Sequence, residues 1–325
     1  MPNTCSQRIV SLLPAATEIL YAIGLGDCVV GVTHECDFPP EASRKPALIR
    51  PRVDPNAAPA ELDRQVRELV ERGESIYAVD AELLVSLQPD LIVTQDLCHV
   101  CAASPEDLGA ALSRLPGDKQ PRVITFTPHN LADVWTGVRQ IGDAAGRTQE
   151  AQALARKLEA RVAEVAGSVA SLNAEPPCVL CLEWFAPPYY AGHWVPEMVR
   201  LAGGIDILGY EGEPSVAVEW GRIMDARPDV IVLMSCGYNL ARNIEVWRST
   251  PLPAGWNDLT AVQSGRVYAV DANSYFSRSG PRLAEGTALL ARLFHSANDL
   301  AALIPPNQQV AATMVQQVST ASSSA

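Results

Sequence analysis

The sequence predicts an α/β protein with two parallel-sheet lobes, joined by one long helix and enclosing a ligand cleft. Three observations predict this architecture. Short apolar strands alternate with helical stretches, a long central segment lacks proline, and one local pattern occurs once in each half of the chain. With 325 residues the chain is long enough for two domains with a core each.

Short apolar runs rich in β-branched residues mark the predicted strands. Strands that are buried on both faces of a parallel sheet read as continuous apolar runs, and helical stretches separate them here. The first set is expected at 8–13, 28–34, 90–95 and 122–127, and the second set at 178–184, 229–235 and 266–272.

The central segment is predicted to connect the lobes. Apolar side chains recur there at helical spacing, and no proline occurs between residues 130 and 175. Gly142 and Gly146 indicate a break before a helix of about twenty residues. The predicted division is a first lobe over 1–129, a connecting helical segment over 130–172, a second lobe over 173–305 and a disordered tail over 306–325.

A local repeat favours two duplicated lobes over the alternative, in which the central helix is an ordinary surface helix of one domain. The stretch LLVSLQPDLIVTQDLC at 83–98 matches RIMDARPDVIVLMSCG at 222–237. Each has an apolar helix end, a Pro-Asp turn, a buried strand and a loop with a cysteine. Self-similarity of this kind is the sequence signature of a duplicated unit.

The charge balance limits the classes of partner. The chain has 25 Lys and Arg against 37 Asp and Glu, a formal net charge of −12. Such a surface repels phosphate backbones and anionic lipids, so nucleic acid is not expected as a partner. No run approaches the roughly 18 apolar residues of a membrane span, so no membrane insertion is expected. We expect a monomer that binds a small molecule.

The first residues set the expected compartment. MPNTCSQ lacks the apolar run of a secretory leader and leads directly into the first strand. As written, the chain is expected in the cytoplasm, or in the periplasm or at the cell surface if the start site is misassigned. Its eight cysteines are then expected to be reduced thiols.

Cysteine and histidine cluster after the predicted strands of the first lobe. Cys98 and Cys101 form a C-x-x-C pair, and His34 and Cys36 follow the second strand. These four side chains are candidate ligands for a soft metal ion such as zinc. The alternatives are a redox pair or small buried side chains of a loop. Cys178 and Cys181 lie within one strand, on opposite faces, and are expected in the core.

Catalytic motifs are absent. The sequence has no G-x-S-x-G elbow, no P-loop and no H-E-x-x-H, and we do not expect an enzyme. The alternative is a cytoplasmic enzyme that reuses a binding-protein fold, in which Cys98 or Cys236 acts with His34 or His129.

The opening of the chain and four later blocks resemble, in order, the substrate-binding proteins of ABC importers for cobalamin, siderophores and haem. They are RIVSLLPAATEILYAIG, GVTHECDFPPEA with AELLVSLQPDLIV, CLEWFAPPYYAGH and YFSRSGPRL, and the cobalamin-binding branch is the most similar. The resemblance covers roughly residues 7–298. It implies two lobes joined by a long helix, which close on a ligand and dock on a membrane permease. In the family, one glutamate on each lobe makes this contact, and Glu82 and Glu219 are the candidates here.

The resemblance also places the ligand contacts, with departures. Glu35 and Gln95 stand where the cobalamin-binding branch has aromatic walls after the second and third strands. Aromatic side chains are retained elsewhere, mainly in the second lobe. A flat corrin needs apolar walls with a few polar anchors. The expected ligand-binding residues are Pro14, Glu35, Tyr77, Gln95, Cys98, Trp184, Tyr189, Tyr275 and Arg278.

These observations predict a transport-associated binding protein for cobalamin or a related corrinoid. For a corrinoid, the first lobe offers His34, Cys36, Cys98 or His99 as an axial ligand to cobalt. The first alternative is binding of a soft metal ion or metal chelate through the Cys and His loops. The second is the enzyme described above, because a fold does not fix a function.

Overall fold

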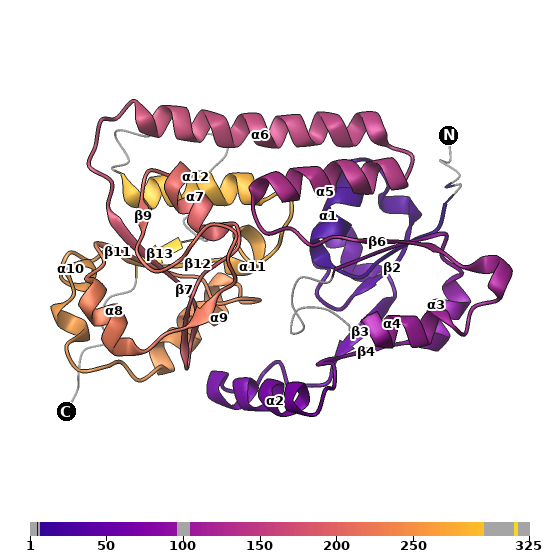
Figure 1. Cartoon of the computed structure of the whole chain (residues 1–325), viewed down its shortest axis with the longest axis horizontal. Helices are drawn as coiled ribbons and strands as arrows, with labels where there is room; N and C mark the ends of the chain where they lie inside the picture. The colour runs from indigo at the N-terminus through magenta and orange to yellow at the C-terminus, as the bar shows by residue number, and fades with distance from the viewer. Residues whose placement is uncertain (1–4, 6, 96–104, 296–314, 318–325) are drawn as a thin grey trace. The chain divides into compact units, whose positions relative to one another are not determined.

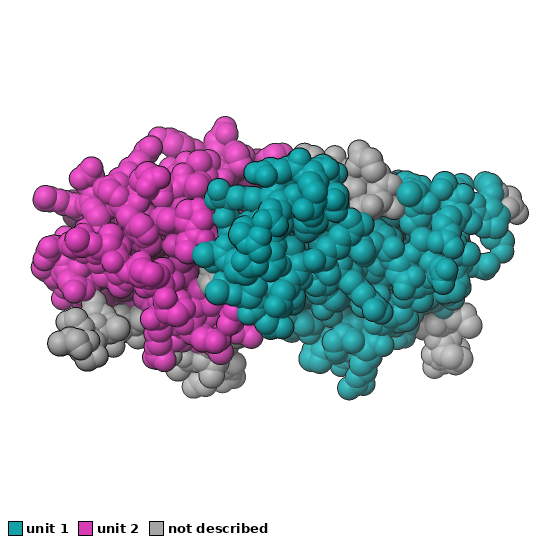
Figure 2. Space-filling view, turned by 90° about the horizontal axis from the view of Figure 1, so that it is seen from below, with its two compact units in different colours: residues 1–128, 132–157 teal, residues 129–131, 158–325 magenta. Residues whose placement is uncertain are grey.

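The structure is a computed structural model, and it describes residues 5, 7–95, 105–295 and 315–317. The chain divides into two compact units. Unit 1 comprises residues 1–128 and 132–157, and unit 2 comprises residues 129–131 and 158–325 (Figure 2). The division falls within α6 (Thr148–Ala170), which is continuous across it.

Unit 1 has a six-stranded sheet in its described part, in the order β4-β3-β2-β1-β5-β6. The strands β1, β2, β3, β5 and β6 are parallel, and β4 runs antiparallel to β3. Their bounds are β1 Ile9–Ser11, β2 Val29–Thr33, β3 Ala47–Pro51, β4 Tyr77–Val79, β5 Leu91–Thr94 and β6 Arg122–Thr125.

Helices flank this sheet (Figure 1). One face packs against α3 and α4, where Val10, Leu48, Leu84 and Ile92 are fully buried in one cluster. Besides α6, the helices of unit 1 are α1 Pro14–Ala22, η1 Gly26–Cys28, η2 Pro40–Arg44, α2 Pro59–Glu71, α3 Ala81–Leu87, α4 Pro105–Leu112, η3 Gly117–Lys119 and α5 Leu131–Ala144.

The break between α5 and α6 depends on two glycines. Gly146 has φ +69°, a left-handed conformation that glycine adopts without a steric penalty. The amide of Arg147 donates to the carbonyl of Gly142 at 2.7 Å, which closes the end of α5. A side chain on Gly142 would collide with Ala151 of α6. The predicted break and the long helix after it are therefore confirmed.

Unit 2 has a seven-stranded sheet in its described part, in the order β10-β8-β7-β11-β12-β13, with β9 also paired to β7. The strands β7, β9, β11 and β12 are parallel, whereas β8, β10 and β13 pair antiparallel. The bounds are β7 Cys178–Phe185, β8 Pro188–Tyr190, β9 Ile205–Asp206, β10 Val216–Ala217, β11 Val230–Leu233, β12 Val267–Val270 and β13 Val315–Gln317.

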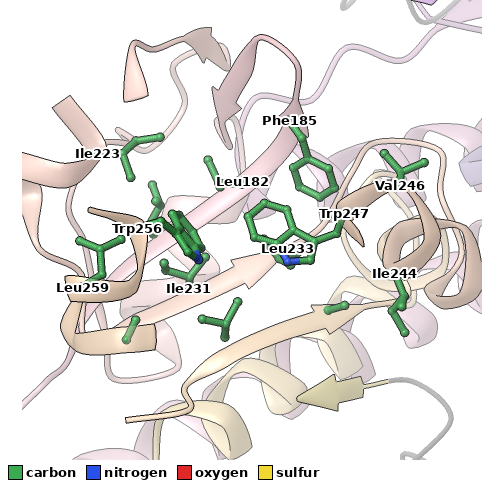
Figure 3. Close-up of a cluster of buried hydrophobic side chains, with 14 of the residues drawn as sticks. Leu182, Phe185, Ile223, Ile231, Leu233, Ile244, Val246, Trp247, Trp256 and Leu259 are labelled. Carbon is green, nitrogen blue, oxygen red and sulfur yellow. The ribbon is translucent and has the colours of Figure 1, made fainter. Parts of the chain in front are cut away.

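The core of unit 2 lies between its sheet and the helices on one face. Phe185, Trp247 and Trp256 form an aromatic series there, with ring centroids 5.1 Å and 5.2 Å apart (Figure 3). Helices α7 and α12 lie against the opposite face (Figure 1). The helices are α7 Val195–Leu201, α8 Trp220–Ala226, α9 Leu240–Ser249, η4 Trp256–Asp258, α10 Thr260–Gln263, α11 Ala272–Tyr275 and α12 Leu283–Phe294.

The Pro-Asp repeat corresponds to the same local structure in both units. Each preceding helix ends in a left-handed residue, Gln88 with φ 43° or Arg227 with φ 46°. Asp90 Oδ2 then accepts a hydrogen bond from the amide of Arg8 at 2.7 Å, and Asp229 Oδ2 accepts one from the amide of Cys178 at 2.9 Å. In both units the aspartate thus fastens the new strand to the first strand of the sheet.

The α/β class with two sheets is confirmed, but three expectations need correction. The sheets are mixed rather than purely parallel, because antiparallel strands extend their edges. Within the predicted disordered tail, β13 pairs with β12, and the other tail residues lie outside the described part. Cys181 is fully buried in the core as expected, whereas Cys178 is only half-buried.

The expectation that all cysteines are reduced is also wrong. Cys5 and Cys28 form a disulfide, with their Cα atoms 5.3 Å apart. The fold brings Cys5, before β1, next to Cys28, which directly precedes β2. Among the described helices, none combines the length and apolarity needed to cross a membrane.

Candidate functional site

Four of the predicted ligand-binding residues lie at one edge of the sheet of unit 1. Pro14 follows β1, Glu35 follows β2 and Gln95 follows β5, and the carboxyl ends of parallel strands meet at one edge. Tyr77 begins β4, which runs antiparallel to β3, so it reaches the same edge. Cys98, His99 and Cys101 lie outside the described residues.

The turn after β2 sends its polar side chains in different directions. The amide of Glu35 donates to Thr33 Oγ1 at 3.2 Å, and the amide of Cys36 donates to the Thr33 carbonyl at 3.2 Å. His34 is exposed, and its Nδ1 lies 3.1 Å from the carbonyl oxygen of Ile49 on β3. The His34 and Tyr77 rings lie 5.8 Å apart. This corner of unit 1 therefore combines an oriented imidazole with an aromatic ring.

The side chain of Cys36, predicted as a metal ligand, turns away from that edge into the interior of unit 1. Its side chain is 2% exposed, and its Sγ contacts Thr17 Oγ1 at 3.0 Å and Thr33 Oγ1 at 3.4 Å. The Thr17 hydroxyl in turn donates to Ser11 Oγ at 2.8 Å. The thiol belongs to a buried polar network between β1, α1 and β2, where hydrogen bonding replaces contact with a ligand.

A metal-ion site is not assembled in the part of the chain that the structure describes. Across residues 5, 7–95, 105–295 and 315–317, no group of three or more His, Cys, Asp or Glu side chains could hold an ion. Structural zinc sites use four such ligands and catalytic sites use three. The expected zinc site therefore finds no support among these residues.

The aromatic residues predicted for the second lobe lie at one edge of the sheet of unit 2. Trp184, near the carboxyl end of β7, stands opposite Tyr189 of β8. Tyr275 and Arg278 follow β12, and each is 9% exposed. The amide of Asn273 donates to the carbonyl of Tyr238 at 3.0 Å, which joins the loops after β12 and β11. These side chains therefore lie on paired strands and hydrogen-bonded loops at the same edge of the sheet.

Tyr238, which follows β11, also belongs to this edge, although it is not among the predicted ligand-binding residues. Its ring centroid lies 5.5 Å from that of Trp184, and the Arg242 guanidinium lies 5.6 Å from the Tyr238 centroid. Burial raises the pKa of the Tyr238 hydroxyl, and the neighbouring Arg242 partly opposes that rise. Tyr238 and Arg242 are four residues apart around the first turn of α9, and this spacing was the signal available in the sequence.

Unit 2 also brings two histidines together. The rings of His129 and His193 lie 6.2 Å apart, although the two residues are 64 positions apart in the sequence. His193 has a positive φ of 53°, and its amide donates to the carbonyl of Glu213 at 2.6 Å. Burial lowers the pKa of His193, and His129 lowers it further because two positive rings would repel. Neither residue was predicted to pair with the other.

The two glutamates considered for permease docking are exposed. Glu82 lies in the first turn of α3, with its side chain 86% exposed and its carboxylate 3.7 Å from Arg114. Glu219 stands at the N-cap position of α8 and is also exposed. Each glutamate lies on its own unit at the start of a helix, where a carboxylate is electrostatically favoured.

Comparison with known proteins identifies the family. The model of the periplasmic binding protein family matches residues 9–274. An ABC transporter substrate-binding lipoprotein of Bacillus subtilis, YvrC, is 25% identical over 290 residues, covering 88% of this chain and 79% of the relative. The vitamin B12-binding protein of Vibrio cholerae is 26% identical over 289 residues, covering 85% of each chain.

Solved structures show the same two-lobed fold. The periplasmic haem-binding protein RhuT from Roseiflexus sp. RS-1, in its apo form, has a TM-score of 0.66 and 26% identity, covering 90% of this chain and 99% of that chain. The periplasmic vitamin B12-binding protein BtuF of Vibrio cholerae has a TM-score of 0.62 and 20% identity, covering 89% and 96%.

These comparisons correct the expected compartment. The match to periplasmic binding proteins and the likeness to a lipoprotein indicate an extracytoplasmic protein, so the expectation of a cytoplasmic chain is wrong. The Cys5–Cys28 disulfide agrees with the correction, because disulfides persist in oxidising compartments. Since the family model spans most of its length, the chain belongs to the periplasmic binding protein family.

Proposed function

We propose that this protein binds cobalamin or a related corrinoid outside the cytoplasm and delivers it to an ABC permease. In this proposal the lobes 1–129 and 173–305, connected by 130–172, close on the ligand. The protein acts as a monomer, without catalysis and without nucleic acid. Glu82 and Glu219 are the proposed permease contacts.

The aromatic edge of unit 2 carries the proposal. Trp184 of β7 and Tyr189 of β8 lie on neighbouring strands, and Tyr275 lies in α11, which follows β12 of the same sheet, with the largely buried Arg278 three positions later. Flat ligands are held by apolar and aromatic walls with a few polar anchors, and this edge offers both. The vitamin B12-binding relative from Vibrio cholerae supports a corrinoid as the flat ligand.

Haem is the second candidate. A porphyrin is also flat and largely apolar, so the same aromatic edge would suit it. The haem-binding RhuT shares 26% identity with this chain over 90% of its length, which is the observation in favour of haem. The corrin carries amide side arms and the porphyrin carries carboxylates, so one site should not bind both equally well. A competition experiment with both ligands therefore shows which one the protein prefers.

Titration calorimetry with cobalamin, cobinamide and ferric haem tests the proposal. Trp184→Ala is expected to weaken binding of the preferred ligand at least tenfold, or about 1.4 kcal/mol, because an aromatic wall is lost. Tyr210→Ala is the matched control, since Tyr210 is an aromatic residue of the same unit and its side chain is 67% exposed. Absence of heat with all three ligands would reject the proposal, and equal losses in both variants would reject the role of Trp184.

A further inference from the structure

The imidazole of His34 is held in one tautomer. Its Nδ1 lies 3.1 Å from the carbonyl oxygen of Ile49, and a carbonyl oxygen can only accept a hydrogen bond. Nδ1 must therefore carry the hydrogen of this contact. A neutral imidazole carries only one N–H, so the lone pair of a neutral His34 is on Nε2. A backbone carbonyl behind one ring nitrogen is the usual support of a histidine that binds a metal through the other.

Hydrogen bonds hold the backbone around His34 against the sheet of unit 1. Ile49 is 3% exposed and lies in β3, between β2 and β4 of the sheet. The Thr33 hydroxyl and carbonyl hold the amides of Glu35 and Cys36, so the chain on either side of His34 is tied to the end of β2. The ring itself is exposed, and the Tyr77 ring lies 5.8 Å away. An exposed imidazole beside an aromatic face can meet the metal of a flat ligand that lies on that face.

The surroundings favour a chelate over a bare ion. A bare ion needs three or four protein ligands, and no such group of side chains occurs within residues 5, 7–95, 105–295 and 315–317. A metal already held by a macrocycle needs only one ligand on its open axial side. The nearby thiol of Cys36 is 2% exposed and contacts two threonine hydroxyls, so it does not compete with His34.

We propose that Nε2 of His34 is an axial ligand to the cobalt or iron of a flat metal chelate bound by this protein. The inference rests on the proposed function and makes it more specific. The ligand class is a chelate with an exchangeable axial position, such as a corrinoid without its own lower base or a ferric porphyrin. The Nε2 lone pair forms the bond to the metal, and a bound water leaves. No electron or proton is transferred, and Nδ1 keeps its hydrogen and its hydrogen bond to the Ile49 carbonyl.

Absorption spectra with aquocobinamide and with ferric haem test this assignment. The wild-type protein is expected to convert the spectrum of the water-ligated probe into that of a nitrogen-ligated one. His34→Ala should abolish this conversion and weaken binding by about tenfold or more. Added free imidazole should restore the nitrogen-ligated spectrum of the bound probe in His34→Ala. Cys36→Ser, which replaces the thiol by a hydroxyl that can still hydrogen-bond to Thr17 and Thr33, should give the wild-type spectrum.

The outcomes separate this inference from the proposed function. If calorimetry shows that the wild-type protein binds a probe whose spectrum stays water-ligated, the axial role of His34 is overturned and the proposed function stands. The same holds if His34→Ala and wild type give identical nitrogen-ligated spectra. If neither probe nor cobalamin binds to the wild-type protein, both are overturned. Because the wild-type spectrum alone decides the first outcome, the test does not depend on how well the variant folds.

Discussion

Removing the Asp229 carboxylate tests the account of the repeated Pro-Asp turn. Asp229 Oδ2 accepts a hydrogen bond from the amide of Cys178 at 2.9 Å, and both residues are half-buried. In Asp229→Ala that amide loses its acceptor at the first strand of unit 2. A hydrogen bond to a charged group contributes about 1.5–3 kcal/mol, so we expect unit 2 to lose stability by about that amount. The backbone bond from the amide of Asp229 to the Cys178 carbonyl, at 2.8 Å, remains in the variant.

The same substitution in unit 1 has a smaller expected effect. Asp90 Oδ2 accepts from the amide of Arg8 at 2.7 Å, but both residues are exposed, so water can replace the lost acceptor. We expect Asp90→Ala to cost about 0.5–1 kcal/mol. Asp225→Ala provides the charge control, because Asp225 is an exposed aspartate of α8 just before the turn. It should change stability by less than about 0.5 kcal/mol.

Tryptophan fluorescence during urea unfolding measures these differences. Of the six tryptophans, Trp135 belongs to unit 1 and the other five to unit 2, so the signal reports mainly on unit 2. Far-ultraviolet circular dichroism reports on both units. If Asp229→Ala unfolds at the same urea concentration as Asp225→Ala, the repeated aspartate does not hold the strands together. If Asp90→Ala is the more damaging substitution, the argument from burial fails.

Two further substitutions test buried charge and backbone conformation. Burial raises the pKa of Asp206 to about 6, although the amides of Leu208 and Gly209 donate to Oδ1 and oppose the rise. Stability from a group with a raised folded pKa is complete below its unfolded pKa, near 4, and is lost as the pH rises through about 6. Asp206→Asn keeps Oδ1 as an acceptor. At pH 4 its free energy of unfolding should equal that of the wild type, and at pH 7 it should be higher by on the order of 1–3 kcal/mol. A difference that does not change with pH would contradict this. Gly146→Ala should destabilise the protein by about 1–2 kcal/mol because of the positive φ. Gly167→Ala, within α6 and with open space at its Cβ, should instead stabilise it by about 0.5–1 kcal/mol, and thermal unfolding of both variants checks the opposite signs.

The central strands could be predicted because their own residues determine them. Residues 91–93 and 230–233 are apolar at every position and fully buried, which is the pattern of a central parallel strand. The edge strand β10 and its neighbour β8 lack this pattern. They contain two and three residues, and they pair because the neighbouring strand offers open backbone groups. Tertiary context decides such strands, and no local run of residues predicts them.

Contacts between residues that are far apart in the sequence could not be predicted from local residue patterns. The spacing of Cys5 and Cys28 gives no sign of a bond, since it depends on how η1 brings the chain from α1 to β2. The approach of His129 to His193 depends on residues 129–131 packing with unit 2 while the rest of α5 belongs to unit 1. In both cases the partners meet because of the path of the backbone, which the residue types alone do not encode.

The turn after β2 shows how far residue types can identify a site. His34 and Cys36 are two positions apart, and in a continuing strand they would lie on the same face. The strand ends at Thr33 instead, and the Cys36 amide donates to the Thr33 carbonyl, which turns the chain. Cys36 consequently points inward to Thr17, while His34 stays outside with Nδ1 on the Ile49 carbonyl. One hydrogen-bonded turn therefore separates two candidate ligands that the sequence could not rank, because it buries the Cys36 thiol and leaves His34 exposed.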